Sequence, residues 1–377
     1  DRAAWLARCR AAYDGPLAGA GGWGHCAEAN WQRHPYADHA AAIWRLDGAL
    51  PKFVRDGATT LWPGGAHLPD DAGWFVAGQA KRWADFTRER ARGVVETVRA
   101  DGTVGYVGEF LRGHFEDTSS GQCGQAAVAL LEYARTSGDR GALAIGLGLL
   151  EASERFTTPR GAQVWELSLH TPDILAAAHQ VHARVLAFEQ TNERRWLDSA
   201  RHWAVRGLPF VYLRDDEPAL PYATIAVFGA THWRAPLWIG LPVQWCGLVY
   251  ADALARLGAH DDALPWRRVA EGILRAGQHM QSGAGPLVGC LPDSFVLRAA
   301  RGAGPWINPG ALLALDARLR GEPFDLHVLD LKDGHRAASA FPLREVDGEL
   351  RAVAGPAKVQ VVIDGREVVE VPGPGGR

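Results

Sequence analysis

The sequence predicts a mainly α-helical fold, an (α/α)6 toroid of helical hairpins followed by a small C-terminal antiparallel β domain. The middle of the chain repeats a unit of long helix, tight polar turn and second helix. Aromatic loops precede six of the expected helices, and after about Gly321 the sequence changes to short segments rich in Val, Leu and Ile. We therefore assign residues 1–320 to a toroid domain that carries the active site, and residues 321–377 to the β domain.

Three helical hairpins are expected in the middle of the chain. Apolar residues recur at helical spacing, as Ile174, Ala178 and Val181 do, and a polar turn separates the two helices of each pair. The pairs are Gly121–Thr136 with a helix to about Arg155, Pro172–Thr191 with Arg194–Gly207, and Pro242–Leu257 with Asp261–Gln278. Earlier helices are expected over Arg2–Tyr13, Ala37–Leu46, Asp71–Trp83 and Phe86–Ala100.

Two of these helix starts carry a strong local signal. Thr171 and Asn308 each stand directly before a proline, and a capping side chain followed by proline at the first helical position is typical of a helix N-terminus. We therefore expect Thr171 and Asn308 to cap the helices that follow them.

The C-terminal segment has the pattern of a β meander. Short apolar segments alternate with Asp-Gly dipeptides, which favour tight hairpin turns. The strands are expected over Asp325–Leu331, Glu349–Val353, Lys358–Ile363 and Glu367–Val371, with turns at Asp333-Gly334, Asp347-Gly348 and Asp364-Gly365. A domain of about 50 residues is too small for an active site of its own, so we expect it to support the toroid.

Composition excludes several classes of function. A net charge of −3 gives no basic bias, which argues against nucleic acid as a partner. No run of about 18 apolar residues exists, so no segment is expected to enter a membrane. Five widely spaced cysteines without a CxxC motif suggest buried small side chains and neither a zinc site nor a disulfide framework. No cofactor and no metal is implied. The oligomeric state is left open, as is the location, cytoplasmic or exported after loss of a signal peptide.

Aromatic and imidazole side chains gather before the expected helices. Nine of 15 tryptophans and six of 14 histidines fall in six stretches that make up less than a fifth of the chain. At one end of several helices they would line a concave surface suited to sugars, whose C–H faces stack on indoles. The stretches are Gly22–Tyr36, Trp62–Phe75, Gly113–Ser120, Trp165–Asp173, Thr231–Trp245 and Gly302–Pro309.

The third stretch is the first candidate for catalysis. It combines His114 with the adjacent carboxylates Glu116 and Asp117 just before a helix, where burial and neighbouring charges can shift a carboxyl pKa. The alternative is that Asp117, Thr118 or Ser119 only caps the helix. His114 and Glu116 also resemble part of a metal site, but no second cluster with ligand spacing accompanies them.

The fourth stretch supplies a possible second carboxylate. Alternation places Glu166 and His170 on one side of the segment and Trp165 on the other. Asp173, close to the helix start, has a structural explanation that is at least as good. Two carboxylates from different loops are what glycoside hydrolysis requires.

The first and fifth stretches are candidates for substrate binding. Arg234, flanked by indoles, could hold a uronic acid carboxylate in bidentate fashion, or it could be a surface arginine stacked on Trp233. Sugar stacking and plain packing are both open for the tryptophans as a class. The candidates are Trp23, His25, Trp31 and His34 in the first stretch and His232, Trp233, Arg234, Trp238, Gln244 and Trp245 in the fifth, joined by His114 and Trp165 from the third and fourth.

With these hairpins, aromatic loops and the Thr136-Ser137-Gly138-Asp139 turn, the chain resembles the six-hairpin (α/α)6-toroid carbohydrate-active enzymes. It is most similar to glycoside hydrolases of the unsaturated glucuronyl hydrolase and exo-β-glucuronidase type. The resemblance is architectural and spans roughly residues 20–320. It implies catalysis by acids at the entrances of the inner helices, here Asp117 or Glu116 with Glu166 as partner and His170 orienting or binding.

The sequence thus predicts a glycoside hydrolase acting on an oligosaccharide or polysaccharide that contains uronic acid. A toroid polysaccharide lyase is the nearest alternative, and it would use His170, His232, Tyr222 or Arg234 around a neutralised uronate. A glycan-binding toroid protein without catalysis is a third possibility, since it would need the cleft but no pair of acids.

Overall fold

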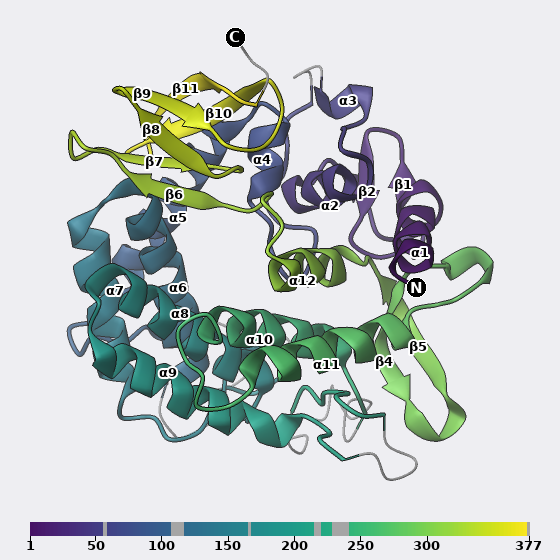
Figure 1. Ribbon diagram of the computed structural model, residues 1–377. Helices are drawn as coiled ribbons and strands as arrows, with labels where there is room; N and C mark the ends of the chain where they lie inside the picture. The colour runs from purple at the N-terminus through teal and green to yellow at the C-terminus, as the bar shows by residue number, and fades with distance from the viewer. Residues whose placement is uncertain (56–58, 107–116, 165–166, 215–219, 228–240, 375–377) are drawn as a thin grey trace.

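A computed structural model describes residues 1–55, 59–106, 117–164, 167–214, 220–227 and 241–374. Helices are the main regular structure in this part of the chain and are arranged as a ring, with the C-terminal strands packed on one side of it (Figure 1). The predicted mainly α-helical toroid with small antiparallel sheets is confirmed.

The three predicted central hairpins are present. Their turns are tight because the residue after the first helix adopts the left-handed conformation in two of them, at Gly138 (φ 74°) and Asn192 (φ 56°). The last helix begins later than expected, because Pro265 precedes its first turn. The hairpins are α6 (Ser120–Ser137) with α7 (Arg140–Ser153), α8 (Ile174–Thr191) with α9 (Arg194–Gly207), and α10 (Gln244–Leu257) with α11 (Trp266–Met280).

The two helices of each hairpin form different layers. Helices α6, α8 and α10 are buried on most sides and rich in alanine, which lets neighbouring helices approach closely. Helices α7, α9 and α11 bury a single face, as expected for an outer layer, and α9 and α11 carry charged residues on the other face. The inner layer continues from α10 to α12 (Gly310–Arg320), which in turn contacts α2 (Ala37–Asp47) and closes the ring.

The N-terminal part corrects one prediction. The sequence predicts a break between the helices Asp71–Trp83 and Phe86–Ala100, and the position of this break is wrong. The break lies at residues 77–79, where Gly78 has φ 72°. The second helix runs from Ala80 through Trp83 to Thr97. The elements in this part are α1 (Arg2–Asp14), β1 (Ala18–Gly19), β2 (Gly22–Gly24), β3 (Arg33–His34), α2, α3 (Lys52–Arg55), α4 (Ala72–Val76) and α5 (Ala80–Thr97).

The C-terminal strands form a four-stranded antiparallel sheet of order β11-β10-β7-β6 and a separate β8-β9 hairpin. The predicted Asp-Gly turns are confirmed, since Asp347 and Asp364 have positive φ and are each followed by a glycine with positive φ. Sequence analysis missed β7 and β8. The strands are β6 (His327–Asp330), β7 (Arg336–Ser339), β8 (Leu343–Val346), β9 (Glu349–Ala352), β10 (Lys358–Ile363) and β11 (Glu367–Pro372).

The sheet is not isolated from the helices. Strands β10 and β7 contact α4, α5 and α6, and the buried residues of the sheet belong to the same hydrophobic core as the helical ring. A further hairpin lies within the ring segment: β4 (Leu291–Val296) pairs with β5 (Arg301–Ile307), so most of the expected loop Gly302–Pro309 is a strand. Short 3-10 turns at Leu208–Phe210, Gly285–Leu287 and Leu297–Ala299 complete the described elements.

The capping predictions had mixed outcomes. Asn308 is confirmed in part, because its Oδ1 accepts from the Gly310 amide at the start of α12. The expectation for Thr171 is wrong: α8 begins two residues later, and Asp173 is its cap, accepting from the Ala176 amide at 2.8 Å.

The five cysteines are buried and unpaired as predicted. Among the described helices, none has the length and apolar character needed to cross a membrane.

Candidate functional site

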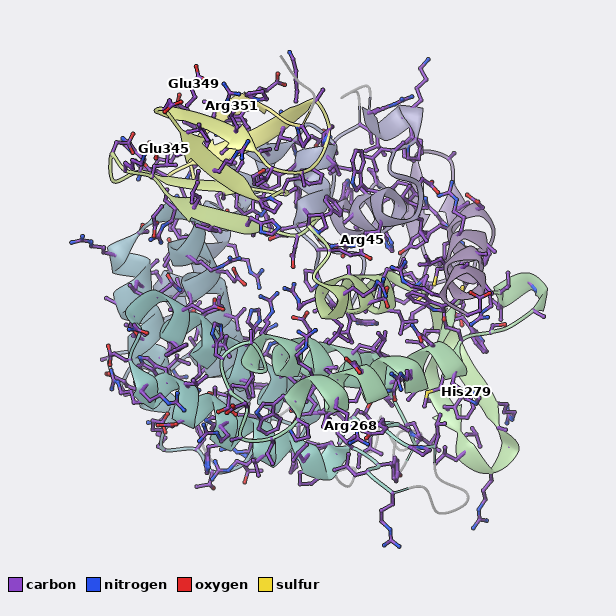
Figure 2. All side chains as sticks on the ribbon, viewed as in Figure 1. Arg45, Arg268, His279, Glu345, Glu349 and Arg351 are labelled. Atoms are coloured by element: carbon purple, nitrogen blue, oxygen red, sulfur yellow. The ribbon has the colours of Figure 1, made fainter. Side chains whose placement is uncertain are left out.

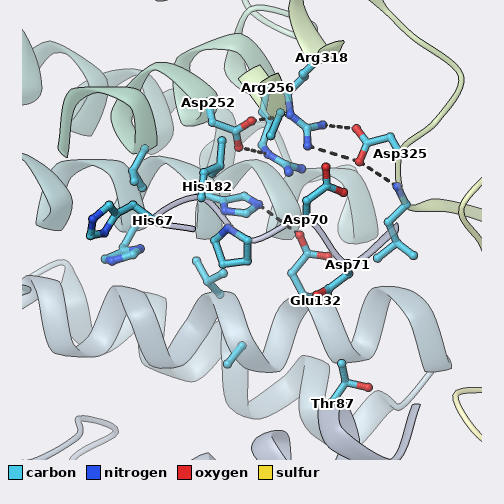
Figure 3. A pocket seen from close by; sticks show the side chains of 18 of the residues that line it. His67, Asp70, Asp71, Thr87, Glu132, His182, Asp252, Arg256, Arg318 and Asp325 are labelled. Carbon is cyan, nitrogen blue, oxygen red and sulfur yellow. Dashed lines mark hydrogen bonds and ion pairs between the residues drawn. The ribbon is translucent and has the colours of Figure 1, made fainter. Parts of the chain in front are cut away.

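A cavity of about 320 Å³ lies inside the ring (Figure 3). Its walls are the inward faces of α2, α5, α6, α8, α10 and α12, together with the segment 67–71 and residues Asp325 and Leu326 next to the sheet. This size falls at the lower end of the range for small-molecule sites. The C-terminal segment therefore contributes directly to the wall of the cavity.

Helical periodicity directs polar side chains into the cavity. On α8, His179 and His182 are three residues apart, and on α6, Gln125 and Glu132 are seven apart, so each pair lies on one face. The same spacing turns Asp252 and other members of α10 inward. The inner helices thus bury apolar faces against each other while a polar stripe remains along the axis of the ring.

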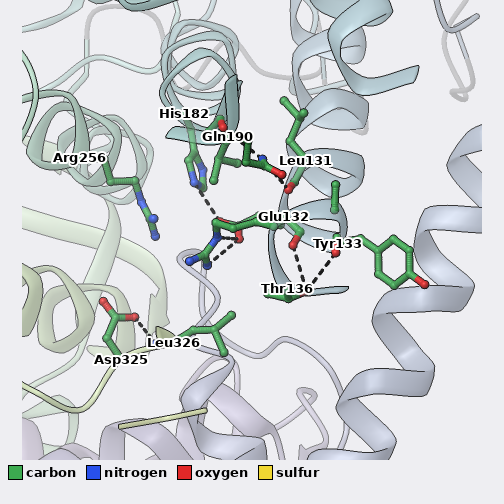
Figure 4. A network of polar contacts seen from close by, with 12 residues as sticks. Leu131, Glu132, Tyr133, Thr136, His182, Gln190, Arg256, Asp325 and Leu326 are labelled. Carbon is green, nitrogen blue, oxygen red and sulfur yellow. Dashed lines mark hydrogen bonds and ion pairs between the residues drawn. The ribbon is translucent and has the colours of Figure 1, made fainter. Parts of the chain in front are cut away.

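Two carboxyl groups, Asp71 and Glu132, lie next to one another on the cavity wall (Figure 3). Figure 4 shows Glu132 from close by with its partner His182. Burial raises the pKa of Asp71, and the negative charge of Glu132 adds to this effect. Burial would also raise the pKa of Glu132, but Arg135, whose Nη2 is 2.8 Å from Glu132 Oε2, together with His182 lowers it well below its usual range. Two neighbouring carboxyl groups are therefore biased toward opposite protonation states.

Three histidines on the wall are held neutral. Burial lowers the pKa of His179 to about 4, and it lowers the pKa of His67 well below the ordinary value. Burial also lowers the pKa of His182, although its Nε2 lies 3.2 Å from Glu132 Oε1. Near neutral pH these imidazoles can accept a proton or exchange hydrogen bonds with hydroxyl groups.

Ion pairs close the end of the cavity at the C-termini of the inner helices. Asp252 accepts from Arg256 Nε at 2.8 Å and from Arg318, and Arg318 Nη1 is 2.8 Å from Asp325 Oδ2 (Figure 3). These two arginines hold the pKa of Asp252 well below its usual range against the effect of burial. Arg45, on the inner side of the ring in Figure 2, pairs with Asp70 at 2.6 Å.

Aromatic rings lie at the opposite end, near the N-termini of the inner helices. His67 stacks on Trp245 with ring centroids 3.9 Å apart, and both line the cavity. His25 is 4.7 Å from His67 and Trp31 is 5.4 Å from His25, by ring centroids. Since Trp31 is 41% exposed, a continuous series of rings connects the protein surface with the cavity.

Buried polar side chains in the first turns of the inner helices hold the surrounding loops. Asp38 on α2 accepts from the Gly65 and Ala66 amides, and Asp173 before α8 accepts from the Ala162 amide at 2.9 Å. Gln244 on α10 accepts from the Thr224 amide at 2.9 Å. Because each loop is tied to a helix N-terminus, the rim of the cavity has a defined backbone path.

The predicted site residues fall into four groups. His25, Trp31 and Trp245 belong to the series of rings, as described above. Trp23 is buried against Phe53 and Gln244 is bound by backbone groups, so both have packing roles. His34 stacks on exposed Trp62 at 3.9 Å between ring centroids, and Tyr222 packs against α11. Outside the described residues lie Glu116, Glu166, His114, Trp165, His232, Trp233, Arg234 and Trp238.

The two predicted catalytic residues that are described lie away from the cavity wall. Asp117 makes a bidentate ion pair with Arg99, at 2.7 and 2.8 Å. His170 Nδ1 lies 3.3 Å from Arg160 Nη1. Neither is among the described residues that line the cavity. The alternative prediction for the third stretch, that one of its residues caps the next helix, is confirmed for Ser119, whose Oγ accepts from the Gln122 amide.

Sequence analysis missed Asp71, Glu132, His179 and His182. A usable signal was present, because charged or imidazole residues interrupt the alanine-rich faces of helices that are otherwise apolar. On a helix that is buried all round, such residues must face either a partner or a cavity.

The fold is known from other proteins, whereas the sequence alone finds no relatives: no protein-family model and no curated protein matches it. The structure is similar to an unsaturated glucuronyl hydrolase from Bacillus sp. GL1, described as responsible for glycosaminoglycan degradation (14% identity, TM-score 0.51, covering 85% of this chain and 95% of that one). It is also similar to a GH76 α-mannanase from Bacteroides thetaiotaomicron (10%, TM-score 0.53, 85% and 95%). A third is a D-mannose isomerase (9%, TM-score 0.51, 85% and 97%).

These likenesses define the class of fold. The chain has the helical toroid that glycoside hydrolases and a sugar isomerase share. The resemblance to six-hairpin toroid enzymes that the sequence predicted is thereby confirmed at the level of the fold.

Proposed function

We propose that this protein is a glycoside hydrolase that acts on a uronic-acid-containing glycan, with the reacting sugar bound in the central cavity. One observation carries the proposal: Asp71 and Glu132 share the cavity and have pKa values displaced in opposite directions. Glycoside hydrolysis needs such a pair, one carboxyl group to protonate the leaving oxygen and one ionised carboxylate facing the sugar.

The roles follow from the protonation states. Asp71, whose pKa is raised, is the better suited of the two to hold a proton and to donate it to the glycosidic oxygen as the bond breaks. Glu132 stays ionised because Arg135 and His182 stabilise its charge, so it opposes the positive charge that develops on the sugar ring. The series of rings from Trp245 to Trp31 offers stacking surfaces for the sugars beyond the scissile bond.

The acids predicted from the sequence form the competing assignment. Asp117, with Glu116 and Glu166, would place catalysis at the entrance loops, and Asp117→Asn separates the two assignments. The charge of Asp117 is already balanced by Arg99. We therefore expect Asp117→Asn to keep at least about a tenth of the wild-type turnover, because the loss of one exposed ion pair costs at most about 1 kcal/mol.

The experiment is a screen of the purified protein on uronic-acid oligosaccharides and chromogenic glycosides. Hydrolysis releases reducing ends without new ultraviolet absorbance, whereas a lyase creates an absorbing unsaturated product. With hydrolysis established, Asp71→Asn and Glu132→Gln are each expected to lower kcat by about a hundredfold or more. Wild-type rates in both variants would refute the cavity assignment, and loss in Asp117→Asn alone would favour the entrance loops.

A sugar isomerase is the second candidate function. The neutral imidazoles of His67 and His179 in one cavity favour it, because moving a proton between adjacent sugar carbons needs a neutral base. Incubation of free mannose, glucose and glucuronate in D2O tests this. Deuterium incorporation at C2 without glycoside cleavage would replace the hydrolase proposal, and silence in every assay would favour a glycan-binding protein.

A further inference from the structure

Five arginines and five carboxylic acids line the described part of the cavity wall, and the arginines differ in how they are engaged. Four of them pair with a carboxylate: Arg45 with Asp70, Arg135 with Glu132, Arg256 with Asp252, and Arg318 with Asp252 and Asp325. Arg90 has no hydrogen bond or ion pair with any residue that the structure describes.

Arg90 is placed by helix α5. Trp83, Thr87 and Arg90 follow one another at spacings of four and three residues, which puts all three on the face that borders the cavity. Trp83 is buried at this face, whereas Arg90 is exposed, so its guanidinium group is accessible to solvent and to a ligand. Arg90 also lowers the pKa of both Asp71 and His179, which locates its charge close to the carboxyl group assigned as the acid.

We propose that Arg90 binds the carboxylate of the uronic acid and so determines the specificity of the cavity for acidic over neutral sugars. A guanidinium group matches a carboxylate with two parallel hydrogen bonds, and the other arginines of the described wall are already committed to protein carboxylates. This inference rests on the proposed function for the identity of the ligand as a sugar.

The charge balance of the wall agrees with an anionic ligand. With all ten groups ionised, the five positive and five negative charges cancel. Asp71 must be protonated to act as the acid, and then the wall carries one surplus positive charge. A sugar with one carboxylate restores neutrality, whereas a neutral sugar leaves Arg90 unpaired. Gln125 is exposed on the neighbouring helix α6 and also lines the cavity, so its amide can form hydrogen bonds with the hydroxyl groups of the same sugar.

The test compares the wild-type protein with Arg90→Gln, Arg90→Lys and the control Arg92→Gln. Arg92 lies on the same helix, its side chain is 78% exposed, and it is not among the described lining residues. Binding of glucuronate and of glucose is measured by calorimetry, and KM and kcat are measured on matched glucuronides and glucosides.

We expect Arg90→Gln to weaken glucuronate binding about tenfold to a hundredfold and to raise KM for glucuronides, with the constants for glucose and glucosides unchanged. Arg90→Lys should recover part of the loss, and Arg92→Gln should behave as wild type. Equal binding of glucuronate by wild type and Arg90→Gln overturns the inference, as does an equal loss for glucose.

The binding assay separates this inference from the proposed hydrolysis. A wild-type protein that prefers glucuronate through Arg90 but cleaves no glycoside contradicts the hydrolase and supports the role of Arg90. Cleavage of glycosides with a preference that depends on Arg234, the arginine predicted from the sequence, contradicts the role of Arg90 and leaves the hydrolase in place.

Discussion

Asp252 is expected to be the most sensitive single position in the interior of the ring. Its side chain is 2% exposed and accepts hydrogen bonds from both Arg256 and Arg318. Asp252→Asn keeps the shape of the side chain but removes its negative charge. Two arginines then face a neutral amide. Its NH2 group is a hydrogen-bond donor and cannot accept from either arginine.

The expected loss follows from the burial of the three partners. Removing one member of a buried ion pair costs about 3–5 kcal/mol, because the remaining charge stays desolvated. Arg256 and Arg318 keep 21% and 24% of their side-chain surfaces exposed, and Arg318 retains Asp325. We therefore expect the lower end of that range, about 3 kcal/mol, for Asp252→Asn.

Urea unfolding at pH 7 measures the effect, with Asp198→Asn as the control. Asp198 pairs with Arg194 at 3.5 Å on the exposed side of α9, with more than half of each side chain exposed, so its loss should cost less than about 0.5 kcal/mol. In a double-mutant cycle, Arg256→Met should cost less in the Asp252→Asn background than in wild type. A loss below about 1 kcal/mol for Asp252→Asn would refute the reasoning.

The pH dependence provides an independent check. The arginines lower the folded-state pKa of Asp252, so the stabilisation is present above the unfolded-state pKa and disappears as the pH falls through the folded-state value. The difference between wild type and Asp252→Asn should therefore be complete at pH 7 and shrink below about pH 4. A difference that stays constant down to pH 2 would contradict an ionic origin.

Three further results are expected. Gly73→Ala should destabilise the protein by about 3 kcal/mol, since the added Cβ would lie 1.8 Å from the Ala37 carbonyl oxygen. Gly93→Ala, at a position on α5 with open space around it, should stabilise the protein by about 0.8 kcal/mol. Urea unfolding of both variants measures these two changes. Asp173→Ala should cost about 2 kcal/mol by the same assay, because the cap of α8 is lost, and a loss below about 0.5 kcal/mol would exclude that role. Turnover should fall as the pH rises through the raised pKa of Asp71, so a basic limb of kcat/KM near pH 4, the ordinary aspartate value, would contradict its role as the acid.

The helices could be predicted well where local signals are unambiguous. Arg194–Gly207 begins and ends at the predicted residues, because a polar turn precedes it and its apolar face has a clear period. The division of the helices before and after Gly78 could not be predicted, since the residues on both sides of that glycine continue the same helical pattern. Strand β7 was missed because Arg336–Ser339 has small side chains that give little β signal, and pairing with β6 and β10 determines its conformation.

The predicted cap at Thr171 shows why helix starts are difficult to assign. Thr171 and Asp173 both precede α8 and both have capping side chains. Asp173 is the cap because its second carboxylate oxygen also accepts from the Ala162 amide of a neighbouring loop. This hydrogen bond joins Asp173 to a loop 11 residues earlier in the chain, so a contact outside the helix decides between two local candidates.

The candidate site was the least predictable part, since it depends on which face of each inner helix turns toward the axis. Trp23 and Trp245 are both candidates for sugar stacking in the sequence, yet Trp23 packs in the core and Trp245 borders the cavity. The sequence predicts sugar-binding chemistry from the gathering of aromatic and imidazole residues before the expected helices. Glu132 and His182 lie 12 and eight residues after the first residues of their helices, and only the arrangement of the ring shows that they face the cavity.

The ion pairs that close one end of the cavity also set the chemistry of its wall. Arg256 binds Asp252 and at the same time lowers the pKa of Glu132, so the charge that Asp252 holds in place acts on the proposed catalytic carboxylate. In Asp252→Asn, Arg256 has one partner fewer and is free to turn toward Glu132, which would lower the pKa of Glu132 further. The stability of the ring and the ionisation of Glu132 are therefore coupled through one arginine. Asp252, which has no part in the proposed proton transfer, is expected to change the pH profile of the reaction.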